Sequence, residues 1–180
     1  MNLKETTVKK NYVFEGKIIK VRRDDALLSN GKPCTREVVE HPGGACVLCV
    51  HEGKVALVKQ FRYAYGEALY EIPAGKLEVG EDPLLAAKRE LEEETGLVAK
   101  RLEHLFTLYP TPGYCNEKIY IYEAKEISLG KVHPDADEFL DIVYLPVEEV
   151  YAMIENGTVR DGKTIIAIKH YAIKNGLISR

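Results

Sequence analysis

Residues 75–97 read GKLEVGEDPLLAAKRELEEETGL, and this stretch decides how the rest of the chain is interpreted. On a helix with about 100° between successive residues, Glu90, Glu93 and Glu94 fall within one angular sector. Like charges at this spacing destabilise a helix by roughly 0.2–0.5 kcal/mol per pair. Such a row of glutamates can hold Mg²⁺, which prefers oxygen ligands and often keeps substrate phosphates in its coordination shell. The alternative is an ordinary glutamate-rich helix face in contact with solvent.

The same stretch contains signals for both ends of a helix. Asp82-Pro83 supplies an N-cap and a first-turn proline, and Thr95-Gly96 supplies a glycine suited to the left-handed conformation after the last turn. The opposite face is apolar and consists of Leu84, Leu85, Ala87 and Leu91. The pattern therefore predicts a well-bounded helix whose apolar face is fixed in a core.

This stretch resembles the Nudix box, the loop-helix-loop signature of the Nudix hydrolases, with the pattern G-x5-E-x7-R-E-U-x-E-E-x-G-U, where U is aliphatic. Every fixed position is present, from Gly75 through Glu81 and Arg89 to Leu97. With average residue usage, a chance match is on the order of 10⁻⁹ per start position. The resemblance implies an α+β Nudix fold, a mixed β-sheet sandwiched between helices, with a small N-terminal antiparallel β appendage. It also implies Mg²⁺-dependent cleavage of a diphosphate, with Mn²⁺ as a possible substitute.

Length and charge restrict the other possibilities. A chain of 180 residues corresponds to one domain with a small appendage, which we place at 1–42, with the Nudix domain at 43–180. The net charge of −3 gives no general attraction to nucleic acid or to a membrane surface. The sequence contains no signal-peptide pattern and no apolar run of about 18 residues. We therefore expect a cytoplasmic protein without nucleic-acid or membrane partners.

The remaining patterns predict the order of strands and helices. Strands are expected at 12–22, 35–40, 45–50, 54–61, 69–72, 101–108, 118–124 and 139–145, and helices at 147–155 and 163–174. Ser29-Asn30-Gly31-Lys32 and Glu52-Gly53 indicate hairpin turns. Residues 130–137 are polar and are typical of a loop.

Cys46-x-x-Cys49 could indicate a zinc or redox site, but it lies in an apolar run that we predict to be a strand. Residues i and i+3 of a regular strand point to opposite faces, so the two thiols cannot bind one metal ion there. Buried structural cysteines are the favoured interpretation.

Other segments resemble the ADP-ribose pyrophosphatase subgroup. These segments are Val58 to Tyr63, Glu71 to Gly75, and Pro112, which stands 16 residues after Gly96. The N-terminal appendage is also similar, and in that subgroup it builds a homodimer whose site draws on both subunits. The resemblance implies hydrolysis of ADP-ribose to AMP and ribose 5-phosphate. One alternative is another nucleoside diphosphate sugar such as GDP-mannose, and a non-catalytic sensor of nucleotide sugars is a further one.

The resemblance assigns roles to the box residues one by one. The implied metal ligands are Glu90, Glu94, Glu93 and the carbonyl of Ala74. Arg89 would orient these ligands without touching the metal, paired with Glu93 at i+4 or with Glu81 across the loop. The alternative for Arg89 and Glu81 is a surface ion pair worth ~0–1 kcal/mol.

A general base is expected on a late loop, outside the box. Glu138 matches best within Pro134-Asp135-Ala136-Asp137-Glu138-Phe139. Asp135 and Asp137 are close competitors, and Glu93 could act instead. The alternative is an ordinary acidic surface loop.

Substrate contacts are expected from both parts of the chain; they are Arg36, Glu37, Arg62, Glu78, Gly113 and Glu117. The two arginines suit phosphate because guanidinium groups bind it in a bidentate manner. Arg36 and Glu37 lie in the appendage, where a partner subunit could deliver them. The chain has no tryptophan to stack on adenine, so Tyr12, Phe14 or Tyr63 could substitute, but for each of these residues taken alone core packing is the expected role.

Overall fold

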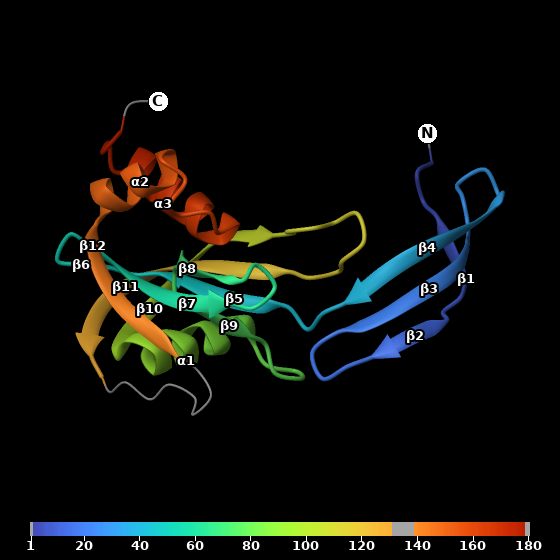
Figure 1. The fold of residues 1–180 in the computed structure, drawn as a ribbon, viewed down its shortest axis with the longest axis horizontal. Helices are drawn as coiled ribbons and strands as arrows, with labels where there is room; N and C mark the ends of the chain where they lie inside the picture. The colour runs from blue at the N-terminus through green and yellow to red at the C-terminus, as the bar shows by residue number, and fades with distance from the viewer. Residues whose placement is uncertain (1, 131–138, 179–180) are drawn as a thin grey trace. The chain divides into compact units, whose positions relative to one another are not determined.

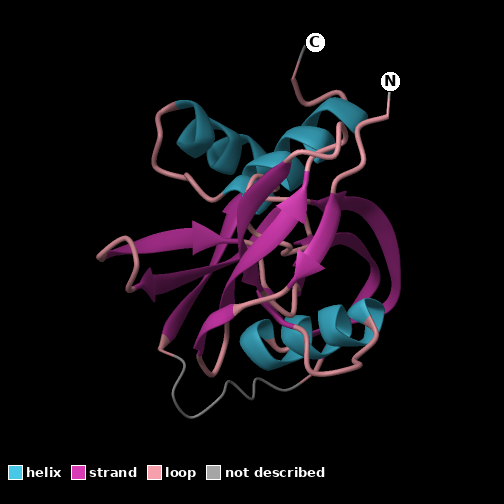
Figure 2. Cartoon of the chain, turned by 90° about the vertical axis from the view of Figure 1, so that its right-hand side faces the viewer, coloured by secondary structure: helices cyan, strands magenta, loops and turns pink. Residues whose placement is uncertain are grey.

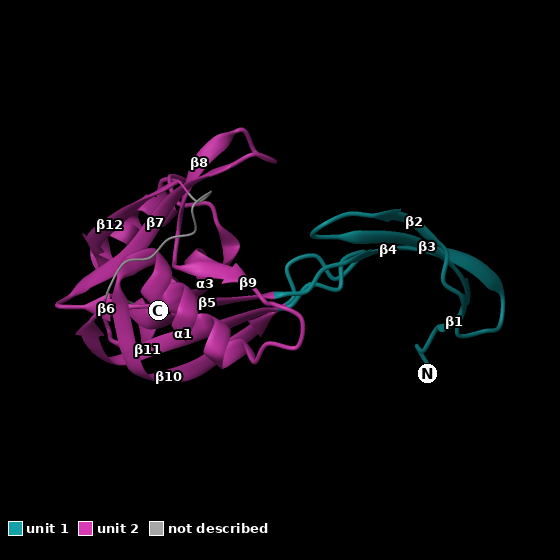
Figure 3. Cartoon of the chain, turned by 90° about the horizontal axis from the view of Figure 1, so that it is seen from below, with its two compact units in different colours: residues 1–43, 109–118 teal, residues 44–108, 119–180 magenta. Residues whose placement is uncertain are grey.

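The computed structural model describes residues 2–130 and 139–178 of the chain. These residues form two compact units, coloured separately in Figure 3. The first unit comprises residues 1–43 and 109–118, and the second comprises residues 44–108 and 119–180.

The first unit is a single antiparallel sheet of β1 (Thr6–Lys9), β2 (Tyr12–Glu15), β3 (Lys20–Leu27) and β4 (Pro33–Glu40). β3 pairs with the other three strands. The hairpin predicted at 29–32 is confirmed, since Leu27 pairs with Pro33. The single strand predicted at 12–22 was wrong. A turn interrupts it where the N–H of Gly16 donates to the carbonyl of Ile19 at 2.9 Å, so β2 folds back on β3.

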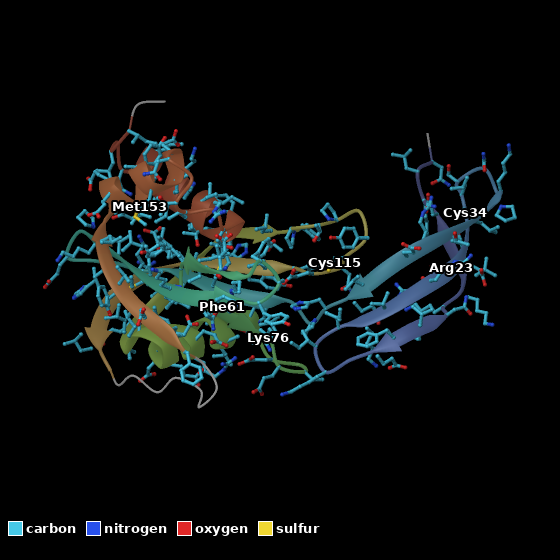
Figure 4. All side chains as sticks on the ribbon, viewed as in Figure 1. Arg23, Cys34, Phe61, Lys76, Cys115 and Met153 are labelled. Atoms are coloured by element: carbon cyan, nitrogen blue, oxygen red, sulfur yellow. The ribbon has the colours of Figure 1, made fainter. Side chains whose placement is uncertain are left out.

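Residues 109–118 join this unit by backbone hydrogen bonds to the end of β4. Val39 donates its N–H to the carbonyl of Tyr114 at 2.7 Å and accepts from the N–H of Asn116 at 3.1 Å. The side chain of Asn116 also accepts the N–H of His41 at 2.8 Å. Figure 4 labels Cys115 in this segment and Cys34 in β4, well apart, and both thiols are free.

The second unit contains two sheets and three helices. One sheet has the order β10 (Leu97–Leu108), β11 (Ile119–Leu129), β5 (Gly44–Leu48) and β9 (Ala74–Lys76). The other contains β12 (Leu140–Pro146), β7 (Lys54–Arg62), β6 (Val50–His51) and β8 (Glu67–Glu71). The helices are α1 (Pro83–Thr95), α2 (Val147–Glu155) and α3 (Gly162–Lys174). The first sheet is mixed, because β5 and β11 run parallel.

The strand β5 lies between two hydrophobic cores. Its residues Ala45 and Val47 pack in a cluster with Leu91 of α1, while Cys46 and Leu48 pack with α2 and α3. Figures 1 and 2 show α1 on one side of the sheets and the other two helices on the opposite side. The predicted arrangement of mixed sheet between helices is confirmed.

The predicted hairpin of 45–50 with 54–61 is only partly present. The short strand β6 pairs with β7 around Glu52-Gly53, but β5 belongs to the other sheet. Cys49 follows the end of β5 and lies in the core with α1, whereas Cys46 lies in the core with α2 and α3. Burial raises the pKa of both thiols to about 12. The prediction that these two cysteines are buried and face opposite sides is confirmed.

Candidate active site

Helix α1 begins and ends at the predicted residues. The carboxylate of Asp82 accepts the N–H groups of Leu84 and Leu85 at 2.8 and 3.2 Å. Gly96 adopts the left-handed conformation with φ 68°, and its N–H donates to the carbonyl of Glu92 at 2.8 Å. The predicted apolar face needs one correction. Leu85 is 59% exposed, because the buried face is centred one residue further along, on Ala86 and Ala87.

Glu90 lies against the backbone at the start of the box. Its carboxylate is buried, and a Cβ added to Gly75 would lie only 1.9 Å from its Oε1. A side chain at position 75 and the observed position of Glu90 therefore exclude each other. The first glycine of the box is required by this close approach, and the observed φ of Gly75 is not one that favours glycine.

Glu94 lies one helical turn beyond Glu90 and is 2% exposed. Its Oε2 accepts the N–H of Ala74 at 3.0 Å. This bond fixes the segment just before the box against the helix. The structure thus brings Ala74, Glu90 and Glu94 together where the start of β9 lies against the second half of α1.

Arg89 holds the carboxylates of the box together. It donates two hydrogen bonds of 3.1 Å to Glu81, one of 2.7 Å to Glu90 and one of 3.0 Å to Glu93. Glu81 also accepts the backbone N–H of Glu78 at 3.0 Å, which closes the box loop. The hydrogen bond from Arg89 lowers the pKa of Glu81, and the same bond raises the pKa of Arg89. Both predicted partners of Arg89 are present, and the contact with Glu90 is an additional one.

The chemical types of these groups suit a divalent cation, which prefers oxygen ligands. Glu90, Glu93 and Glu94 lie on little more than one turn of α1, and the backbone of Ala74 and Gly75 lies against two of them. The absence of a Cβ at Gly75 leaves room for Glu90 beside that backbone. Among the described residues no three acidic, histidine or cysteine side chains form a ready metal cluster. Arg89 occupies oxygens of Glu90 and Glu93 in this arrangement, so a cation would share or replace its positive charge.

Arg62 belongs to a second charged group, which the sequence did not reveal. Both oxygens of Glu71 accept from Arg62, at 2.5 and 2.7 Å, and Glu71 also accepts from Lys163 at 2.5 Å. Burial alone would raise the pKa of Glu71, but the bond from Arg62 and the charge of Lys163 outweigh it and lower the pKa. The pKa of Arg62 is raised, chiefly by its bond to Glu71 and to a smaller extent by the negative charge of Glu94.

The predicted substrate residues of the first unit have contacts within that unit. Arg36 donates to both oxygens of Glu5, at 2.8 and 2.6 Å, and the neighbouring Glu37 is exposed. Glu117 lies 3.3 Å from Nδ1 of His41. Gly113 is exposed, in the segment 109–118 that binds to the end of β4.

The three candidate aromatic residues are exposed, so the expectation of core packing was wrong for each. Tyr12 is 46% exposed, Phe14 is 54% exposed and Tyr63 is 93% exposed. Nζ of Lys20 lies 5.8 Å from the centroid of the Tyr12 ring, so Tyr63 presents the most uncovered ring of the three. The expected general base Glu138 and its competitors Asp135 and Asp137 lie outside the described residues.

Comparison with known proteins decides the family. The NUDIX domain family matches residues 39–167. The chain belongs to the Nudix hydrolase family. A second match, to the nucleoside diphosphate sugar hydrolase N-terminal domain, covers residues 5–39 of this Nudix hydrolase. Members of the family generally use a divalent metal ion.

Individual relatives cover nearly all of this Nudix hydrolase. It is 42% identical to an ADP-ribose pyrophosphatase of Bacillus subtilis (strain 168), over 98% of this chain and 97% of the relative. It is 39% identical to a methanol dehydrogenase activator of Bacillus methanolicus, over 96% of this chain and 95% of the relative. A GDP-mannose pyrophosphatase of Yersinia pestis (strain Pestoides F) is 34% identical, over 77% of this chain and 75% of the relative.

A solved structure titled as that of an ADP compounds hydrolase has the same fold, with a TM-score of 0.84. It is 21% identical, and the alignment covers 99% of this chain and 100% of the other. Within the described residues, no helix is long and apolar enough to cross a membrane.

Proposed function

We propose that this Nudix hydrolase cleaves the diphosphate of ADP-ribose with Mg²⁺, giving AMP and ribose 5-phosphate. The observation that carries the substrate is the 42% identity with an ADP-ribose pyrophosphatase across 98% of the chain. The charged groups of the second unit agree with diphosphate chemistry, because the carboxylates of α1 and the guanidinium of Arg62 lie close enough for Glu94 to influence Arg62.

In the proposed reaction one water molecule attacks a phosphorus atom and the bond to the bridging oxygen breaks. Glu138 takes the proton from the water, and Glu93 is the alternative base. Arg62 and Arg36 bind phosphate oxygens, while Glu37, Glu78, Gly113 and Glu117 contact the remainder of the substrate. A divalent cation, when bound by Glu90, Glu93, Glu94 and the Ala74 carbonyl, neutralises phosphate charge and acidifies the water.

A substrate panel tests the choice of ADP-ribose. The purified protein is given ADP-ribose, GDP-mannose and NAD⁺ with Mg²⁺, and the products are separated by chromatography. We expect ADP-ribose to be hydrolysed faster than the other two compounds, giving AMP and ribose 5-phosphate. Much faster turnover of GDP-mannose than of ADP-ribose would contradict the proposed substrate and support the alternative that the Yersinia pestis relative suggests. Binding of ADP-ribose without any turnover would instead support a sensor.

Two substitutions test the catalytic roles. Glu94→Gln should reduce kcat by about 10² or more, because it removes a charged ligand from the cation site. Glu138→Gln should reduce kcat by about 10²–10⁴ and leave cation affinity unchanged, because a general base acts only on the water. Retention of most of the rate in either variant would remove that residue from its proposed role.

We also propose that the protein works as a homodimer through its first unit. Every residue of β1 and β2 is exposed, and neither hydrophobic core contains a residue of this unit. Val13 is 66% exposed and Phe14 is 54% exposed, and a second copy would cover such apolar side chains.

Four free thiols agree with a reducing compartment, which supports a cytoplasmic location.

Light scattering after size-exclusion chromatography tests the dimer. The wild-type chain should elute with twice its mass, whereas Phe14→Lys should shift it towards the monomer. Val79→Lys is the matched control, because Val79 is also exposed but lies in the box loop. A monomeric wild-type protein, or a shift caused equally by Val79→Lys, would contradict the proposed interface.

A further inference from the structure

The first turn of α3 is attached to the segment that leads into the box. Lys163 donates to Glu71 at 2.5 Å and lies 3.0 Å from Oδ1 of Asp161. The hydroxyl of Thr164 accepts the N–H of Ile72 at 2.9 Å. One helical turn therefore fixes both the side chain of residue 71 and the backbone of residue 72, immediately before Pro73-Ala74-Gly75.

Glu71 passes this constraint to Arg62. The two bonds from Arg62 use its Nε and Nη2, and within the described residues its Nη1 donates no hydrogen bond. The side chain of Arg62 is 39% exposed, whereas that of Glu71 is 3% exposed. Because the guanidinium is planar and rigid, fixing one edge determines the direction in which the other edge points. The outward edge of Arg62 is thus set by the position of Glu71.

Lys163 also determines how much positive charge Arg62 can offer. Glu71 is shared by two cations, and Asp161 lies against the second of them, so the four groups sum to zero charge. Without Lys163, the buried carboxylate of Glu71 would be neutralised by Arg62 alone. The guanidinium would then be drawn towards Glu71 and offer a weaker field to an incoming phosphate.

We propose that Lys163 is a positioning residue for diphosphate binding, because through Glu71 it fixes the direction of Arg62 and preserves the positive charge that Arg62 presents to the substrate. This inference rests on the proposed function, in which Arg62 contacts the diphosphate. The alternative is that Lys163 only anchors α3 to the sheet.

A double-mutant cycle between Lys163 and Arg62 separates these possibilities. Steady-state kinetics are measured for the wild type, Lys163→Met, Arg62→Ala and the double variant. We expect Lys163→Met to raise KM about tenfold, with kcat changed less than about threefold, because it weakens one charge-assisted contact to phosphate. In the Arg62→Ala background the same substitution should change KM less than about twofold. Equal changes of KM in both backgrounds would overturn the proposal.

Val159→Ala is the control for a purely structural effect. Val159 is 1% exposed and packs in the same core as α3, but its apolar side chain cannot form a hydrogen bond with Arg62, Glu71, Asp161 or Lys163. This variant should lower Tm and leave KM unchanged. If Lys163→Met behaves in the same way, Lys163 is an anchor of the helix and the proposal fails.

A binding measurement keeps the test independent of turnover and of the true substrate. Calorimetry with inorganic pyrophosphate and Mg²⁺ should show about tenfold weaker binding for Lys163→Met, and an unchanged affinity would overturn the proposal. Lys163→Gln, which retains a donor for Glu71 without the charge, replaces Lys163→Met if that variant does not fold. If the wild-type protein does not hydrolyse ADP-ribose, only the proposed substrate is refuted, because the binding of pyrophosphate still reports on the role of Lys163.

Discussion

Replacing Arg89 by methionine should destabilise the protein, and a divalent cation should reduce the effect. Arg89 donates to Glu81, Glu90 and Glu93, and each of these bonds lies between 2.7 and 3.1 Å. Methionine keeps much of the aliphatic volume of arginine but removes its charge. The three carboxylates would then face one another without the cation that joins them.

The size of the effect follows from how far each partner is exposed. Arg89 and Glu93 are 32% and 34% exposed, so their i,i+4 pair contributes ~0.3–0.5 kcal/mol. Glu81 is 17% exposed and loses two hydrogen bonds, which costs about 1 kcal/mol. Glu90 is 9% exposed, and losing a charged partner there costs about 1–3 kcal/mol. Together this is about 2–4.5 kcal/mol, or a fall in Tm of about 5–18 °C for a chain of this length.

Thermal unfolding followed by circular dichroism measures the effect, first with a chelator and then with excess Mg²⁺. The difference in Tm between wild type and Arg89→Met should narrow with Mg²⁺, because a bound cation supplies the missing positive charge to the folded state. Arg101→Met is the control, since Arg101 is 59% exposed and its pair with Glu103 should contribute less than about 1 kcal/mol. Equal Tm values in chelator, or a gap that Mg²⁺ does not alter, would refute the reasoning.

Three further outcomes follow from burial. Gly75→Ala should reduce both kcat and Tm, because the Cβ of the new alanine would lie 1.9 Å from Oε1 of Glu90 and would displace that carboxylate. Wild-type kinetics in this variant would contradict the prediction. The lowered pKa of Glu71 gives stability that is present above its ordinary value of 4.5 and is lost as pH falls through the folded pKa, so the Tm advantage of wild type over Glu71→Gln should shrink between about pH 5 and pH 3. A difference in Tm between the two proteins that stays constant over this pH range would contradict the prediction. Thiol reagents should label two cysteines quickly and leave Cys46 and Cys49 unlabelled until unfolding, as mass spectrometry of the labelled peptides can show.

Local signals in the sequence predicted the features that depend on neighbouring residues. Asp82-Pro83 and Gly96 mark the ends of α1 because capping involves groups only a few residues apart. The opposite facing of Cys46 and Cys49 follows from the two-residue period of a strand. The turn at Gly16 was missed because the apolar residues on both sides of it continue a strand-like pattern.

Contacts between distant parts of the chain were not predictable from these patterns. Glu71 and Lys163 are 92 positions apart, and neither belongs to a short motif that implies the other. The contact between Gly75 and Glu90 likewise depends on how β9 lies against α1, although the required glycine was visible in the box. In the structure the carboxylate of Asp161 caps α3 by accepting the N–H of Thr164, which is a local contact and carries no information about Glu71.

Because β5 pairs in parallel with β11, this part of the sheet cannot fold until β11 has been synthesised. Cys46 pairs with Ile121, which leaves the ribosome 75 residues later, or about 4–15 s at ordinary rates of translation. Once residue 97 has been made, β5, its neighbour β9 and the complete box are present, but the edge of β5 that pairs with β11 in the native sheet has no neighbouring strand. A nascent chain that ends before residue 119 therefore exposes an unpaired apolar strand edge. Ribosome pausing in this window should therefore favour chaperone binding.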